Sequence, residues 1–170
     1  MRVLVFGTFD GLHPGHRFFI AQALQRALGS SGRSSQRASA IANGEISGAG
    51  DAVKRAVPEG RYERGELYVV VARDENVKRF KGRLPEHPAD ARRRAVQEMF
   101  PEAHVYVGEV DDYFLPVLTV KPDLLLLGYD QKLPPGVEIA DFAEAGIEVE
   151  RVKPYRPQMY KSSLLREEKK

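Results

Sequence analysis

Residues 2–16 read Arg-Val-Leu-Val-Phe-Gly-Thr-Phe-Asp-Gly-Leu-His-Pro-Gly-His, and this stretch decides the fold. Residues 2–6 are short and apolar, which predicts a buried strand that ends at a glycine-containing loop. The Pro-Gly turn of the loop opens a helix over residues 15–28, where apolar residues recur at helical spacing before the stop signal Gly29. The stretch therefore predicts strand, polar loop and helix in succession.

The rest of the chain repeats this alternation. We expect strands at residues 66–73, 104–107, 123–127 and 147–152, helices at residues 89–99, 112–120 and 137–145, a charged loop at 74–88, and a short helix from Ser162. The central strands are continuous apolar runs, which is typical of a parallel sheet covered on both faces. The pattern predicts an α/β fold with a doubly wound, five-stranded parallel sheet of the Rossmann-like kind, and a site at the carboxyl ends of the strands.

Residues 29–65 interrupt the pattern. They are rich in Ser, Gly, Ala and Arg and have almost no large aliphatic side chains, so they cannot bury enough apolar surface to offset the entropy of ordering. We interpret them as a flexible, low-complexity surface insertion in a single domain of residues 1–170. Because the insertion follows the end of the first helix, we expect it to lie opposite the site and not to touch substrate.

Composition excludes several classes of function. The net charge of +2 is too small to indicate a nucleic-acid partner. The absence of cysteine removes disulfides, thiolate catalysis and cysteine-ligated zinc, and fits a reducing compartment. No apolar stretch is long enough for a signal peptide or a membrane span. We expect a cytoplasmic protein that acts on small molecules, with no membrane partner.

The loop after the first strand carries the chemistry. His13 and His16 flank Pro14 and Gly15 at the predicted start of a helix, where free N–H groups favour an anion. Imidazoles beside that anion can donate hydrogen bonds to phosphate and stabilise charge on a leaving pyrophosphate. The alternatives are two incidental histidines at a helix start, or zinc, for which no third ligand stands at a recognisable spacing. We assign no metal ligand.

Residues 7–16 resemble the His-x-Gly-His signature of the cytidylyltransferase-like nucleotidyltransferase superfamily. Within it the chain is most similar to the archaeal-type FAD synthases, which are FMN adenylyltransferases. The similar stretches are residues 71–77, 81–83, 127–131 and 161–163. The resemblance covers nearly the whole chain except the insertion, which is not part of the family pattern.

The resemblance implies roles for the signature loop and for the residues after the second strand. Thr8, Phe9, Pro14 and Gly15 would hold the nucleotide, and His13 and His16 would bind its phosphates and support the transition state. Lys78, Lys81 and Arg83 form a cationic loop at the predicted active face, which suits closure over a polyphosphate. The alternative is a solvated charged loop. We favour function for Lys81 and Arg83.

Three residues are expected to face the acceptor: Asp10, Asp74 and Arg92. Asp74 would face the acceptor or a magnesium ion, and the alternative is that it caps a helix or turn. Arg92 matches the arginine that follows an acidic turn in the family. Its neighbours Arg93 and Arg94 point elsewhere on the helix and are expected to face solvent.

The remaining candidates bind the nucleotide from the end of the fourth strand and from the carboxyl-terminal segment. Gln131 has a donor and an acceptor that can read a base edge, and Asp130 can bind a ribose hydroxyl or the metal. Tyr129 could stack or simply pack. Ser162 and Ser163 could cap a helix, contact phosphate, or do both.

The resemblance implies transfer of AMP from ATP to FMN, giving FAD and pyrophosphate, with Mg²⁺ entering as the metal–nucleotide complex. The alternatives are a cytidylyltransferase acting on glycerol-3-phosphate or another small phosphorylated alcohol, and a non-catalytic nucleotide-binding protein. A homodimer is an expectation that rests on the resemblance alone.

Overall fold

Five parallel strands in the described residues form one sheet, in the spatial order β3-β2-β1-β4-β5. The computed structural model describes residues 1–29, 40–41, 45, 65–110, 112–133 and 136–153. The strands are β1 (Arg2–Gly7), β2 (Glu66–Val71), β3 (His104–Val107), β4 (Leu124–Leu127) and β5 (Glu148–Arg151). The predicted doubly wound α/β fold is confirmed.

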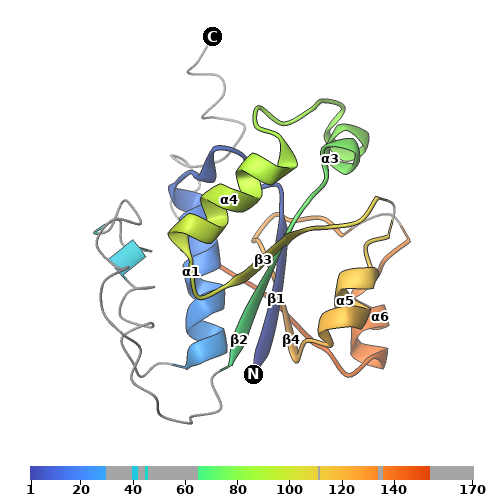
Figure 1. The fold of residues 1–170 in the computed structure, drawn as a ribbon. Helices are drawn as coiled ribbons and strands as arrows, with labels where there is room; N and C mark the ends of the chain where they lie inside the picture. The colour runs from blue at the N-terminus through green and yellow to red at the C-terminus, as the bar shows by residue number, and fades with distance from the viewer. Residues whose placement is uncertain (30–39, 42–44, 46–64, 111, 134–135, 154–170) are drawn as a thin grey trace.

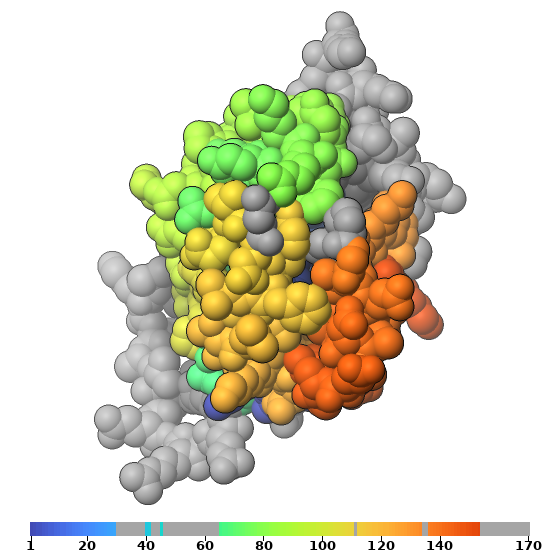
Figure 2. All heavy atoms as spheres, turned by 90° about the vertical axis from the view of Figure 1, so that its right-hand side faces the viewer, coloured from blue at the N-terminus to red at the C-terminus, as the bar shows by residue number. Residues whose placement is uncertain are grey.

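Helices cover both faces of this sheet (Figure 1). Val3 and Val5 of β1 point to the face that packs on α1 (Pro14–Leu28) and α4 (Ala89–Met99). Leu4 points to the opposite face, where α5 (Leu115–Val120) and α6 (Ile139–Glu144) pack. In the space-filling view α5 and α6 face the reader (Figure 2). Both faces of the strands are therefore apolar, which is why the strands read as continuous hydrophobic runs.

The strand order changes direction at β1, and this places the site. From β1 the chain adds β2 and β3 on one side, and then β4 and β5 on the other. In open sheets of this kind ligands bind outside the carboxyl ends of the strands where the order reverses. That point lies between β1 and β4, directly at the signature loop.

The prediction of a charged loop at residues 74–88 is wrong for the first half of that segment, which forms the helix α3 (Asp74–Lys81). The helix has acidic residues in its first turn and basic residues in its last turn, an order that complements the helix dipole. It buries only a narrow stripe that includes Val77, and it ends at Gly82 with a φ of 71°. A stripe this narrow is missed when apolar periodicity is the main criterion.

The other boundaries differ from expectation only at the ends. The α5 helix begins at Leu115 and not at Asp112, because the Asp112 carboxylate accepts hydrogen bonds from the N–H groups of Phe114 and Leu115 and caps the helix from outside. The α6 helix begins after Glu138, whose side chain forms a capping box with Asp141. The predicted helix at residues 89–99 is confirmed with its bounds.

The expected insertion lies almost wholly outside the described residues. Ile41, which is described, is buried in the core on the α1 face of the sheet. Downstream of the insertion, the Glu66 N–H donates to the Met1 carbonyl at 3.0 Å, so the chain re-enters the sheet at the amino end of β1. Among the described helices, none is long and apolar enough to cross a membrane.

Candidate active site

The signature loop turns sharply as it leaves β1. Phe9 and Leu12 have positive φ values of 51° and 35°, and Gly11 between them has 70°. Side-chain-bearing residues adopt this region at an energetic cost, and such strain concentrates at functional sites. The loop therefore has the backbone character expected of a ligand-binding segment.

The Phe9 ring has a structural task. It is 1% exposed, stacks on Phe19 at 6.3 Å between ring centroids, and meets the edge of His16 at 5.6 Å. It also folds back over Gly7, where a Cβ atom would stand 2.5 Å from the ring. A larger residue at position 7 would displace the ring. Because the ring is buried, contacts between Phe9 and a nucleotide would come from its backbone.

His13 and His16 lie together at the start of α1. Their ring centroids are 3.7 Å apart and the rings are nearly parallel, with 26° between planes. His13 precedes the helix, and its carbonyl accepts the N–H groups of His16 and Arg17. The helix start thus presents two imidazoles beside the positive end of the helix dipole, an arrangement suited to a polyphosphate.

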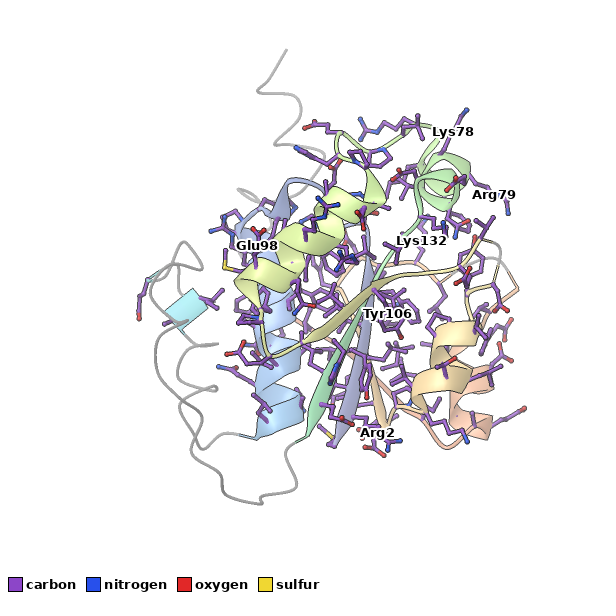
Figure 3. All side chains as sticks on the ribbon, in the orientation of Figure 1. Arg2, Lys78, Arg79, Glu98, Tyr106 and Lys132 are labelled. Atoms are coloured by element: carbon purple, nitrogen blue, oxygen red, sulfur yellow. The ribbon has the colours of Figure 1, made fainter. Side chains whose placement is uncertain are left out.

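The structure brings Lys81 to this loop. Its ammonium group lies 3.0 Å from the Thr8 hydroxyl oxygen, so a residue of the last turn of α3 reaches the residue after β1. Lys78 is exposed on α3 (Figure 3), and Arg83 is exposed just past its end. Lys81 therefore lies at the signature loop, and contact of Lys81 and Arg83 with phosphate stays a prediction.

Arg92 is a buried clamp between the ends of β1 and β2. It is 1% exposed, and its guanidinium donates to the carbonyls of Thr8 at 2.5 Å, Ala72 at 2.8 Å and His87 at 2.8 Å. It also pairs with the Asp74 carboxylate at 2.6 Å. A guanidinium held in this way has no free edge for a ligand, so the geometry favours a positioning role over the expected acceptor contact.

Asp74 and Asp10 are likewise engaged by the protein. The second Asp74 oxygen accepts the Ala89 N–H at 3.3 Å at the start of α4, which is the capping role that the sequence left open. Asp10 is 8% exposed and accepts the N–H groups of Glu86 and His87 at 2.8 and 3.2 Å. Both carboxylates organise the segment that joins α3 to α4, and their contact with an acceptor stays a prediction.

The loop after β4 is fastened to β1 by Gln131. Its amide oxygen accepts the Gly128 N–H at 3.0 Å, and its amide nitrogen donates to the Phe6 carbonyl at 3.2 Å. The side chain therefore spans the two strands where the sheet order reverses. Base recognition by Gln131, as expected from the sequence, would have to use the remaining donor and acceptor capacity of its amide.

Tyr129 and Asp130 stand at the outer side of the same loop. Tyr129 is 37% exposed, and burial of part of its ring together with the neighbouring Asp130 raises the pKa of its hydroxyl. Contact of either residue with a nucleotide stays a prediction. Ser162 and Ser163 lie outside the described residues, so their roles stay predictions.

The sequence analysis missed Arg151. At the end of β5 its guanidinium donates to the carbonyls of Gly128 at 3.0 Å and Gln131 at 2.7 Å, and so closes the 128–131 loop from the other side. A basic residue at the carboxyl end of a predicted strand was the available signal. The residues around it do not indicate that its side chain turns back to an earlier loop.

The described residues contain no group of three or more His, Cys, Asp or Glu side chains that could hold a metal ion. At the carboxyl edge of a doubly wound sheet, two imidazoles, the Lys81 ammonium group and the N–H groups of a helix start lie together, an arrangement that suits the binding of a polyphosphate. This is the architecture of a nucleotidyltransferase, an enzyme that needs positioning and charge neutralisation more than a nucleophile.

Comparison with known proteins identifies the branch of this class. The chain is 35% identical to the FAD synthase of Methanopyrus kandleri over 157 residues, which are 91% of this chain and 81% of the relative. It is 35% identical to that of Halorhabdus utahensis over 91% of the chain and 83% of the relative, and 32% identical to that of Methanosphaerula palustris over 80% and 63%. The chain belongs to the FAD synthase family.

A solved structure agrees in fold. The crystal structure of the lipopolysaccharide core biosynthesis protein from Thermoplasma volcanium matches 91% of this chain and 98% of its own, with a TM-score of 0.61 and 26% sequence identity. No model of a protein family matches the chain.

Proposed function

We propose that this protein is an FMN adenylyltransferase, which transfers AMP from ATP to FMN and releases pyrophosphate. Membership of the FAD synthase family supports the substrates, and the observation that carries the chemistry is the stacked His13 and His16 pair at the start of α1 with Lys81 beside Thr8. A phosphate oxygen of FMN attacks the α-phosphorus of ATP. The bond between the α-phosphorus and its bridging oxygen breaks, and that oxygen leaves with pyrophosphate.

The residues of the site act on charge and position. His13, His16 and Lys81 lie where they can bind the phosphates and offset the negative charge that grows on the leaving pyrophosphate. The N–H groups at the start of α1 add to this effect. The nucleotide would approach from the 128–131 loop beside β4, and the acceptor from the β2 and β3 side, so that the two meet over β1.

Magnesium is proposed to enter with ATP. The described residues hold no ready cluster of ligands, and the nearby carboxylates of Asp10 and Asp74 already accept protein hydrogen bonds. Mg²⁺ is commonly bound through substrate phosphates with few protein ligands, which fits this donor set. The ion would neutralise phosphate charge when bound.

The assay is pyrophosphate release from purified protein with Mg²⁺, crossing ATP and CTP against FMN, glycerol-3-phosphate and no acceptor. We expect release with ATP and FMN, together with FAD formation seen by chromatography. Release with CTP and glycerol-3-phosphate in its place would overturn the proposal. A His13→Asn, His16→Asn double variant is the matched control for a contaminating activity.

Three expectations about the whole protein remain proposals. We propose that it works in the cytoplasm without nucleic acid or membrane, that it forms a homodimer, and that residues 29–65 do not touch substrate. Sedimentation equilibrium tests the dimer. Deletion of residues 30–64 tests the insertion: a folded but inactive deletion variant would contradict that proposal.

A further inference from the structure

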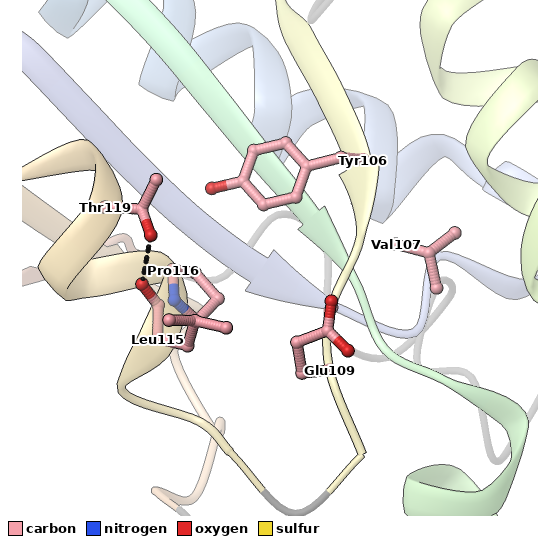
Figure 4. A pocket seen from close by; sticks show the side chains of 7 residues that line it. Tyr106, Val107, Glu109, Leu115, Pro116 and Thr119 are labelled. Carbon is pink, nitrogen blue, oxygen red and sulfur yellow. Dashed lines mark hydrogen bonds between the residues drawn. The ribbon is translucent and has the colours of Figure 1, made fainter.

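A pocket of about 190 Å³ opens between the end of β3 and the start of α5 (Figure 4). Tyr106, Gly108 and Glu109 form its β3 side, and Leu115, Pro116 and Thr119 form its α5 side. The pocket therefore belongs to the half of the sheet away from the 128–131 loop. None of the roles assigned so far uses these residues.

Tyr106, which lines the pocket, has a buried hydroxyl for which the described part of the chain provides no hydrogen-bond partner. Tyr106 directs its ring toward α5 (Figures 3 and 4), and its hydroxyl is buried without a hydrogen bond to any described residue. Burial, with a smaller effect of Tyr68, raises its pKa to about 12, so the group is protonated at neutral pH and can donate. Most buried polar groups in proteins are hydrogen-bonded. The Tyr106 hydroxyl is therefore suited to donate a hydrogen bond to a ligand atom.

The pocket also lies within reach of the signature loop. The Ala72 N–H donates to the Gly7 carbonyl at 2.9 Å, and the Gly108 N–H donates to the Val71 carbonyl at 2.9 Å. These bonds place the ends of β1, β2 and β3 side by side. Two strand spacings separate Gly7 from Gly108, which is about 10 Å. The ribityl chain of FMN, which joins its phosphate to its ring, has a comparable length.

We propose that this pocket receives the isoalloxazine ring of the acceptor, with its pyrimidine edge directed at the Tyr106 hydroxyl. This inference rests on the proposed function. The ring carbonyls are the hydrogen-bond acceptors that a protonated phenol requires, and Leu115 and Pro116 offer apolar surface to a ring face. The pocket volume is sufficient for one end of the ring, and the remainder extends toward the signature loop.

The pocket bears on the choice of acceptor. Glycerol-3-phosphate has no ring to fill it and is too short to reach from the signature loop to Tyr106. A flavin supplies both a hydrogen-bond acceptor for the buried Tyr106 hydroxyl and a ring that covers the apolar wall of the pocket. The β3–α5 pocket therefore selects a ring-bearing phosphate, and it separates the two sides of the site by substrate: nucleotide beside β4, acceptor beside β3.

The test compares two tryptophan substitutions on the same helix. Leu115→Trp fills the pocket, whereas Leu118→Trp is the matched control, because Leu118 is 65% exposed and does not line the pocket. Tyr106→Phe removes the hydroxyl alone. For each variant we would measure KM for FMN and for ATP, and the Kd of FMN by titration of its fluorescence, with thermal unfolding as the check on folding.

We expect Leu115→Trp to weaken FMN binding at least about tenfold and Tyr106→Phe about fivefold, with KM for ATP unchanged in both. Leu118→Trp should behave like the wild type. Unchanged FMN affinity in Leu115→Trp, or an equal loss in both tryptophan variants, would overturn the pocket assignment while FAD synthesis by the wild type continued. If the wild type neither binds FMN nor makes FAD, the proposed function fails with it.

Discussion

The two sides of β1 are held in place by different means. On the β2 side the clamp, which consists of Arg92 with its bonds to Thr8, Ala72, His87 and Asp74, is buried. On the β4 side the 128–131 loop is held by Gln131 and by the exposed guanidinium of Arg151.

The difference indicates that the Arg92 clamp and the 128–131 loop have different roles. A buried guanidinium bonded to three carbonyls cannot be released without leaving those groups unsatisfied, so the clamp holds the signature loop firmly. The exposed bonds of Arg151 compete with water and can open at little cost. We infer that the clamp sets the catalytic geometry and that the 128–131 loop adapts to its ligand.

The largest effect is expected from His13 and His16, which belong neither to the Arg92 clamp nor to the 128–131 loop. The His13→Asn, His16→Asn double variant should lower kcat about 100- to 1000-fold, because it removes the two groups that we propose stabilise the leaving pyrophosphate. Its thermal stability should stay near that of the wild type. Steady-state kinetics and calorimetry check this pair of results, and a drop of less than about fivefold in kcat would count against the histidines as catalytic residues.

The clamp itself is tested by Arg92→Ala. We expect a loss of about 3 kcal/mol in the free energy of unfolding, because several buried carbonyls and a carboxylate lose their partner. The matched control is Arg94→Ala on the same helix, whose pair with Asp90 is exposed and should contribute little to the free energy of unfolding. Urea denaturation measures both. Equal effects would show that Arg92 does not hold the loop.

Gln131→Leu tests the hydrogen bonds by which Gln131 connects the end of β4 to β1. The substitution keeps the approximate size and removes both hydrogen bonds, so we expect KM for ATP to rise about tenfold with a smaller change in kcat. KM for FMN should not change, because we propose that FMN approaches from the β2 and β3 side. A selective rise in KM for FMN would reverse the assignment of the two sides.

The smallest expected effect is that of Arg151→Ala. Loss of two exposed hydrogen bonds to the 128–131 loop should raise KM for ATP about threefold and leave the free energy of unfolding within about 1 kcal/mol of the wild type. Arg26→Ala, which removes an exposed pair with Glu150, is the control and should leave KM unchanged. An effect on stability as large as that of Arg92→Ala would remove the contrast between the two sides.

Much of the fold could be predicted from the sequence, because it rests on local patterns. Apolar runs, the stop signal Gly29 and the Pro-Gly turn each act within a few residues, so these patterns predict the described strands and most of the described helices to within a few positions. The α3 helix was missed because its apolar stripe is narrow and its signal is the order of its charges. The signature loop was found because its residues are contiguous.

The candidate site was only partly predictable for the same reason. The sequence by itself determined an α/β protein of parallel strands, with His13 and His16 at a helix start and a lysine-containing segment after the second strand. It also named Arg92 and Gln131 as residues of interest. Residue type and order are sufficient for these inferences, since each depends on neighbours along the chain.

Only the tertiary structure decided what those side chains do. Arg92 reaches Thr8 across 84 positions of sequence, Gln131 reaches Phe6 across 125, and Arg151 closes a loop that precedes it by 20 or more. No local pattern encodes such pairings, because they arise when parallel strands bring distant chain segments to the same edge of the sheet. Whether a charged side chain meets a ligand or the protein's own carbonyls is fixed by that packing.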